Sequence, residues 1–270
     1  MDIYENLQLH ILKYIPDESN ILYNFILTNK LYKHALEDRL NTVYWEKVED
    51  IVEKQIADIM KQGSAFSGSL DLRNNQIDAK GCEILAPALE KMTALEGLEL
   101  DVNLIDTDGC KYLAPFLAKM TGLRTLYLGE NQIDAKACEQ LAPSLAEMTA
   151  LETLSLCCNK IDAKGCEHLA PALVKMTALE WLDLGYNQID ADGCKHLAPA
   201  LAKMTALELL FLGNNLIGAK GCEYLAPVLP GMTELKSLWL DGNQIDANGK
   251  EIIQEAWRNA GKNQNHGLYL

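Results

Sequence analysis

The chain has 270 residues, about half of them apolar, so it can bury a sizeable core and is not a disordered tail. Its 38 acidic and 24 basic residues give a net charge of −14. Nucleic acid and anionic membranes repel such a chain, which excludes them as partners and favours a basic protein surface. The first residues lack the basic and apolar regions of a secretory signal, and no apolar run approaches the ~20 residues that span a bilayer.

Residues 1–62 form a predicted all-helical head. Apolar residues spaced along one face predict a first helix that ends before Pro16. Residues 21–28 and 31–40 predict two more helices, and an amphipathic stripe predicts a fourth over residues 48–60. We expect the apolar face of this fourth helix to cover the open end of the domain that follows, so that the head acts as a cap.

Residues 63–270 form a predicted repeat domain with a C-terminal cap. Its seven units are 28 residues long and begin at Leu70, Leu98, Leu126, Leu154, Leu182, Leu210 and Leu238. The first six units keep nine framework residue types, which in the second unit are Leu98, Leu100, Asn103, Ile105, Cys110, Leu113, Leu117, Met120 and Leu123. The framework decays in the seventh unit, as expected for an end repeat without a neighbour.

Each unit predicts a strand, a turn and a helix. In the second unit, Leu98 and Leu100 flank a polar residue as in a half-buried strand, whereas Cys110, Leu113 and Leu117 follow one face of a helix. We expect parallel strands, with the framework Asn inside the turn and an Asp as the N-cap of each helix except in the sixth unit, where Gly218 takes that place. A proline in each of the first six helical segments predicts a kink or a restart of the helix.

The eight cysteines predict free thiols in a reducing, cytoplasmic compartment. Six of them recur every 28 residues, so equivalent Cα atoms lie about 8–10 Å apart, too far for a disulfide. Cys157 and Cys158 are adjacent and occupy variable strand positions, where at least one is expected to face solvent. No CxxC pair is present to begin a zinc site, and we expect neither a metal nor a cofactor.

The framework LxLxxNxI followed by GCxxLAPALxxMTxLxx resembles the 28-residue leucine-rich repeat of the ribonuclease-inhibitor class over about 200 residues. The resemblance implies an α/β horseshoe solenoid with parallel strands on the concave face and helices outside. The spacing of strands and helices also favours this shape. Strands stack ~4.8 Å apart while packed helices need about 10 Å, so the array must curve with its strands on the concave side. The near-identical repeats also resemble those of secreted effectors from intracellular bacteria, which implies delivery into a host cell.

The head resembles an F-box motif. The residues that carry this resemblance are Ile15-Pro16-Asp17, then Leu27-Thr28-Asn29-Lys30-Leu31-Tyr32, then Trp45. The head departs from the motif at Asn6-Leu7-Gln8, where the usual Leu-Pro start is absent, and in the long distance from Tyr32 to Trp45. The resemblance implies a docking module for a ubiquitin ligase, as the alternative to a cap.

The sequence predicts no enzyme, since it contains no P-loop, GxGxxG, GxSxG or HExxH motif. His168 and His196 lie two residues after framework cysteines. Residues two apart on a helix point in different directions, which argues against Cys–His catalysis.

The variable strand positions carry the predicted function, because their side chains point away from the helices. Relative to the first Leu of each unit, they are −1, +1, +3 and +4. The predicted partner-binding residues at these positions are Glu99, Asp101, Tyr127, Glu130, Trp181, Asp183, Tyr186, Phe211, Trp239 and Asp241. We expect one aromatic patch from Trp181, Tyr186, Phe211 and Trp239, an acidic flank toward the N-terminal end, and room for close approach at Gly129, Gly185 and Gly213.

Two classes of function follow from these features. In the first, the concave face binds a folded protein with a basic surface and inhibits or masks it, for example by occluding an active site, as the ribonuclease-inhibitor resemblance implies. In the second, the head docks a ubiquitin-ligase scaffold while the horseshoe recruits the substrate. Exposed apolar residues on the head favour the adaptor, whereas their burial against the first repeat favours the cap.

Overall fold

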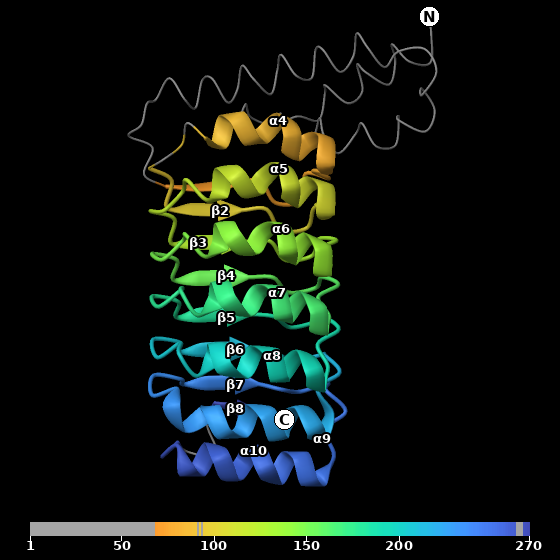
Figure 1. Cartoon of the computed structure of the whole chain (residues 1–270), viewed down its shortest axis with the longest axis vertical. Coiled ribbons are helices and arrows are strands. Elements are labelled where there is room, and N and C mark those ends of the chain that lie inside the picture. Colours follow the sequence, from red (N-terminus) through yellow and green to blue (C-terminus); the bar gives the residue numbers. More distant parts are fainter. Residues whose placement is uncertain (1–67, 91, 93, 263–266) are drawn as a thin grey trace, which may run out of the picture.

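The computed structural model describes residues 68–90, 92, 94–262 and 267–270 (Figure 1). The predicted cap over residues 1–62 and the F-box-like motif lie outside the described residues. In the described part, helices form one layer and strands a second layer behind it, and both follow chain order along the long axis of the molecule.

Eight strands form one parallel sheet in the order β1 to β8. They are β1 (Ser69–Asp71), β2 (Gly97–Glu99), β3 (Thr125–Tyr127), β4 (Thr153–Ser155), β5 (Trp181–Asp183), β6 (Leu209–Phe211), β7 (Ser237–Trp239) and β8 (Leu268–Tyr269). From β1 to β7 each residue pairs with the residue 28 positions later, as Leu98 does with Leu126. At the last pair Leu238 lies opposite Leu268. The parallel sheet predicted from the repeats is therefore confirmed.

Each strand from β1 to β7 is followed by a helix on the outer layer. The helices are α4 (Ala79–Leu89), α5 (Thr107–Leu117), α6 (Ala135–Leu145), α7 (Ala163–Leu173), α8 (Ala191–Leu201), α9 (Gly218–Leu225) and α10 (Ala247–Asn259). Because strands pack more closely than helices, the strand side of such an array is concave. The fold is the α/β horseshoe solenoid that the repeats predict.

The predicted N-caps are confirmed. In α5 the Asp106 carboxylate accepts a hydrogen bond from the Gly109 N–H at 3.0 Å, and Asp134, Asp162, Asp190 and Asp246 do the same in their helices. The prolines lie in the last turn of α4 to α8 without ending them. In the sixth repeat α9 ends at Leu225, and a 3-10 helix over Ala226–Gly231 carries the chain onward, so the predicted restart occurs only there among the described helices.

The core is a continuous stack of framework side chains between sheet and helices. Each of the six framework cysteines is buried, and Trp257 fills the core at the position that leucine holds in earlier repeats. All eight cysteines are free thiols. Among the described residues, no helix has the length and apolar composition needed to cross a bilayer.

The framework asparagines join consecutive repeats. The Asn131 Nδ2 donates hydrogen bonds to the carbonyls of Leu128 and Gly129 in its own repeat, and to Leu100 O in the preceding one at 3.0 Å. Its Oδ1 accepts from the Ile105 N–H at 3.0 Å. This buried amide thus satisfies backbone groups on both sides of the junction, as predicted.

Candidate functional site

The concave face of the sheet is the candidate site, because α4 to α10 cover only the opposite face (Figure 1). We name its residues by four rows, at positions −1, +1, +3 and +4 from the first Leu of each repeat. All ten predicted partner-binding residues lie in these rows. Glu130, Tyr186 and Asp241 are exposed, and the other seven are half-buried.

Five aromatic rings form a continuous ladder across β3 to β8. The ladder comprises Tyr127, Trp181, Phe211, Trp239 and Tyr269. Tyr127 and Phe211 each meet Trp181 edge to face, with ring centroids 5.7 and 5.9 Å apart. Phe211 stacks on Trp239 at 3.9 Å, and Trp239 stacks on Tyr269 at 4.8 Å. The structure therefore brings together four of the predicted residues and one that the sequence analysis missed.

The ladder changes row where it crosses β4. Tyr127, Phe211, Trp239 and Tyr269 lie at the +1 position, whereas Trp181 lies at −1. The strand between Tyr127 and Trp181 carries only the small residues Thr153 and Ser155 on this face. The Trp181 ring can therefore span the width of β4 to reach Tyr127.

Tyr269 completes the ladder from a strand outside the 28-residue period. Leu268 lies 30 residues after Leu238, because the last helix is longer than the others. The sequence signal that was available is the Leu268-Tyr269-Leu270 pattern, in which two leucines again flank a variable residue. Tyr269 is exposed, and its ring ends the stack at the C-terminal edge of the sheet.

Tyr186 does not join the predicted aromatic patch. It is the most exposed large hydrophobic residue described, with 61% of its surface accessible, and its backbone is left-handed with φ at 53°. It makes no ring contact with another aromatic side chain among the described residues. A residue at the +4 position leaves the extended strand conformation, which turns its side chain away from the +1 row.

Two carboxylates lie half-buried beside the ladder and are not ion-paired among the described residues. The Gly185 N–H donates to Asp183 Oδ1 at 2.9 Å, and the Gly129 N–H donates to Asp101 Oδ1 at 2.7 Å. Burial raises the pKa of both carboxyl groups, and the backbone hydrogen bonds oppose that shift only in part. Half-buried negative charge without a direct ion pair favours a cationic group on a partner.

The three predicted glycines do not leave open space. An added Cβ at Gly129 would lie 2.8 Å from Cys157 Sγ, and one at Gly213 would lie 3.0 Å from Asp241 Oδ1. A Cβ at Gly185 would lie 3.2 Å from Asp183 Oδ1. The prediction that these glycines admit a partner is wrong, because neighbouring side chains of the same face already fill the space.

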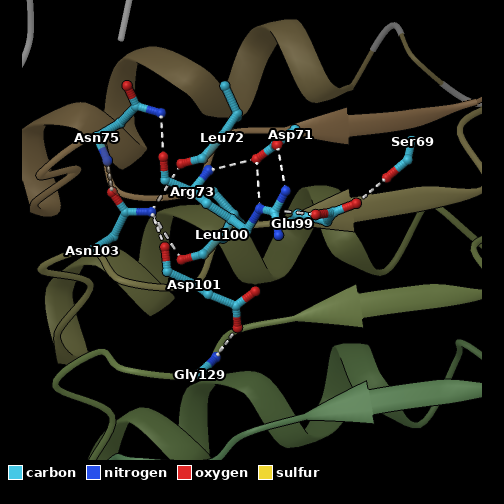
Figure 2. A network of polar contacts seen from close by, with 10 residues as sticks. All are labelled: Ser69, Asp71, Leu72, Arg73, Asn75, Glu99, Leu100, Asp101, Asn103 and Gly129. Atoms are coloured by element: carbon cyan, nitrogen blue, oxygen red, sulfur yellow. Dashed lines mark hydrogen bonds and ion pairs between the residues drawn. The ribbon is translucent and has the colours of Figure 1, made fainter. Parts of the chain in front are cut away.

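The N-terminal end of the face is a polar network centred on Arg73 (Figure 2). Arg73 pairs with Asp71 at 2.7 Å and with Glu99 at 3.0 Å, and Ser69 Oγ donates to Glu99 at 2.8 Å. The hydrogen bond from Arg73 lowers the pKa of the Asp71 carboxyl group. The predicted acidic flank is thus real in composition, but Arg73 already neutralises part of its charge.

Two features of the described residues bear on metal binding and on thiol reactivity. No group of three or more His, Cys, Asp or Glu side chains there has an arrangement that fits a metal ion. Burial raises the pKa of Cys157 to about 12, so this thiol is protonated at neutral pH. A protonated thiol is a weak nucleophile.

Comparison with known families gives one match, to the Leucine Rich repeat family over residues 69–86 and 175–198. The first segment covers β1 and most of α4, and the second covers β5 and most of α8. A comparison with curated proteins finds no match. The match and the repeated strand–helix unit agree, and together they support a leucine-rich repeat protein. Leucine-rich repeats typically form non-enzymatic scaffolds that bind other proteins.

Proposed function

We propose that the concave face binds a folded partner protein with a basic surface and masks a functional surface of that partner, such as an enzyme active site. The single observation that supports this most strongly is the ladder of five aromatic rings on the face that none of the described helices covers. Side chains of this type are enriched at protein interfaces, where a few of them provide most of the binding energy.

The composition of the face indicates the charge of the partner. Six of its variable positions are acidic and one is basic, and the whole chain carries a net charge of −14. Such a surface attracts basic proteins and raises their association rate at low salt. The half-buried Asp183, beside Phe211 in the +1 row, and Asp101, on the N-terminal side of the ladder, would then pair with positively charged side chains of the partner.

The decisive experiment captures the partner and then removes the rings. The full chain serves as bait in extracts of its source organism and of that organism's host, and mass spectrometry identifies the bound proteins. Trp181→Ala and Trp239→Ala are each expected to weaken binding by about 2 kcal/mol or more, roughly thirtyfold. Lys175→Ala, on the exposed outer surface after α7, is the control. Tryptophan variants that fold and bind like wild type, beside a control that does not, would refute the proposal.

The F-box-like head supports a different proposal, a substrate-recruiting adaptor of a ubiquitin ligase. It keeps the concave face as the substrate site and adds a docking function for residues 1–62. Capture with the full chain and with residues 63–270 separates the two. Ligase subunits retained only by the full chain would favour the adaptor.

A further inference from the structure

Cys157 and Cys158 differ from the other six cysteines in both position and exposure. The six framework cysteines are buried in the core between sheet and helices. Cys157 and Cys158 follow β4 in the +3 and +4 rows, and both are half-buried at the concave face. Framework packing therefore does not account for these two thiols.

The backbone brings the two thiols to the same side of the sheet. In a regular strand, neighbouring side chains point to opposite faces. Cys158 has a left-handed backbone with φ at 53°, which breaks that alternation. The two thiols are close enough to influence each other's pKa, and Ser155 Oγ lies 3.5 Å from Cys157 Sγ.

Covalent geometry disfavours a direct bond between these sulfurs. The peptide bonds of the described chain are all trans, so adjacent Cα atoms are about 3.8 Å apart. Disulfides normally join Cα atoms that are roughly 4.4–6.8 Å apart, and closer pairs are strained. A single atom that bonds to both sulfurs removes this constraint, because the sulfurs can then stay further apart than in a disulfide.

We propose that Cys157 and Cys158 form a dithiol site for a thiophilic ligand that bridges two sulfurs through one atom, with trivalent arsenic as the ligand class. An arsenoxide, R–As=O, condenses with the two thiols. Two As–S bonds form, the As=O bond and both S–H bonds break, and the oxygen leaves with the two protons as one water molecule. Neither sulfur nor arsenic changes oxidation state, so the reaction requires no oxidant or reductant.

The surroundings of the pair suit a neutral, compact adduct. Gly129, in the neighbouring repeat, packs closely against Cys157, because an added Cβ there would lie 2.8 Å from Cys157 Sγ. Asp183 and Glu130 place negative charge near the thiols, which disfavours thiolates and anionic ligands. An arsenoxide is uncharged, and its adduct with two thiols is uncharged as well.

The test uses the reduced full-length protein and phenylarsine oxide as the probe. We expect one phenylarsine per chain at stoichiometric dose, measured by intact mass. We also expect selective loss of alkylation at Cys157 and Cys158 in peptide maps. Because one anchor remains after either thiol is removed, Cys157→Ser and Cys158→Ser should each retain the probe about 100-fold less strongly. Cys194→Ala removes a framework thiol instead and should retain it like wild type.

Circular dichroism establishes that each variant is folded before the probe is added. Adducts that map to framework cysteines would overturn the proposal. So would undiminished retention by a folded Cys157→Ser variant, or no adduct on the folded wild type. This site does not depend on the concave face being a partner-binding surface, since the assay contains no partner.

Discussion

The two ends of the concave face are built from opposite kinds of interaction. At the N-terminal end, charged side chains surround Arg73 and satisfy one another (Figure 2). At the C-terminal end, Phe211, Trp239 and Tyr269 are stacked in parallel. Ion pairs on a surface contribute little and weaken with salt, whereas stacked rings contribute through buried apolar area that salt does not screen. The polar end therefore suits recognition of charge, and the aromatic end provides rigid anchors.

The largest difference should follow from removing the ring at the centre of the stack. Trp239→Ala removes both parallel ring contacts and uncovers Phe211 and Tyr269. We expect the free energy of unfolding to fall by about 2–3 kcal/mol, measured by urea denaturation. Ser237→Ala, on the same strand, is the control and should change it by less than about 1 kcal/mol. Equal losses in both variants would mean that the rings do not stabilise this end.

Backbone strain offers a second contrast, because the +4 row is left-handed at both ends. Val102 at the N-terminal end has φ at 57°, and Asn214 at the C-terminal end has φ at 55°. Valine is β-branched and tolerates this region poorly, whereas asparagine adopts it readily. Val102→Asn should therefore stabilise the protein by about 1 kcal/mol.

The reverse exchange, Asn214→Val, should destabilise the protein by about 1–2 kcal/mol. Thermal unfolding of both variants measures these two changes in stability. A loss of stability in Val102→Asn would show that packing of the valine side chain outweighs its backbone strain.

The carboxylates at the two ends should respond to acid with opposite signs. Arg73 lowers the pKa of Asp71, so Asp71 stabilises the fold above its unfolded pKa, near 3.9, and this contribution is lost as pH falls. Burial raises the pKa of Asp183, so its ionisation costs stability as pH rises through the folded pKa.

At pH 7, Asp71→Asn should thus lower the melting temperature, and Asp183→Asn should raise it. Both differences should shrink toward about pH 3, where the unfolded carboxyl groups are protonated. Melting curves of the two variants at both pH values measure this. Shifts of the same sign in both variants at pH 7 would contradict the contrast between a paired and an unpaired carboxylate.

The smallest effect is expected from the ion pairs themselves. Arg73→Met removes the ion pairs of this exposed arginine with Asp71 and Glu99 and should lower the melting temperature only slightly. The loss should diminish when melting is repeated in high salt. A loss that persists unchanged in high salt would indicate packing by the arginine stem rather than charge.

The fold was predictable from the sequence because its determinants recur in every repeat. The buried leucines, the Asn that joins repeats and the Asp at each N-cap all depend on contacts within one unit or with the next. The repeats therefore determine the sheet without information from distant parts of the chain. The strand β8 was not predicted, because a longer helix precedes it and shifts it out of the 28-residue period.

The candidate site was less predictable, since its details depend on side chains that differ between repeats. The sequence indicated which residues face the concave side, but not that Trp181 reaches Tyr127 across small residues. It also gave no sign that carboxylates occupy the space beside the glycines. Tyr186 is separated from the rings by its own left-handed backbone. The alternation of residues along a strand does not predict such a conformation at a single residue.

The hydrogen bonds of the framework asparagines should allow a whole repeat to be removed without disturbing its neighbours. At each junction the Asn Oδ1 accepts from a backbone N–H 26 residues earlier, and its Nδ2 donates to a carbonyl 31 residues earlier. The contacts are the same at every junction, so they do not depend on which two repeats are joined. Excision of residues 154–181 would leave every remaining junction with its usual partners and place Tyr127 beside Asp183. The array should then unfold cooperatively with one repeat fewer, while the order of side chains on its concave face is rewritten. The number of repeats and the side chains on the concave face can therefore change without loss of the fold. A shortened array that fails to fold would contradict this.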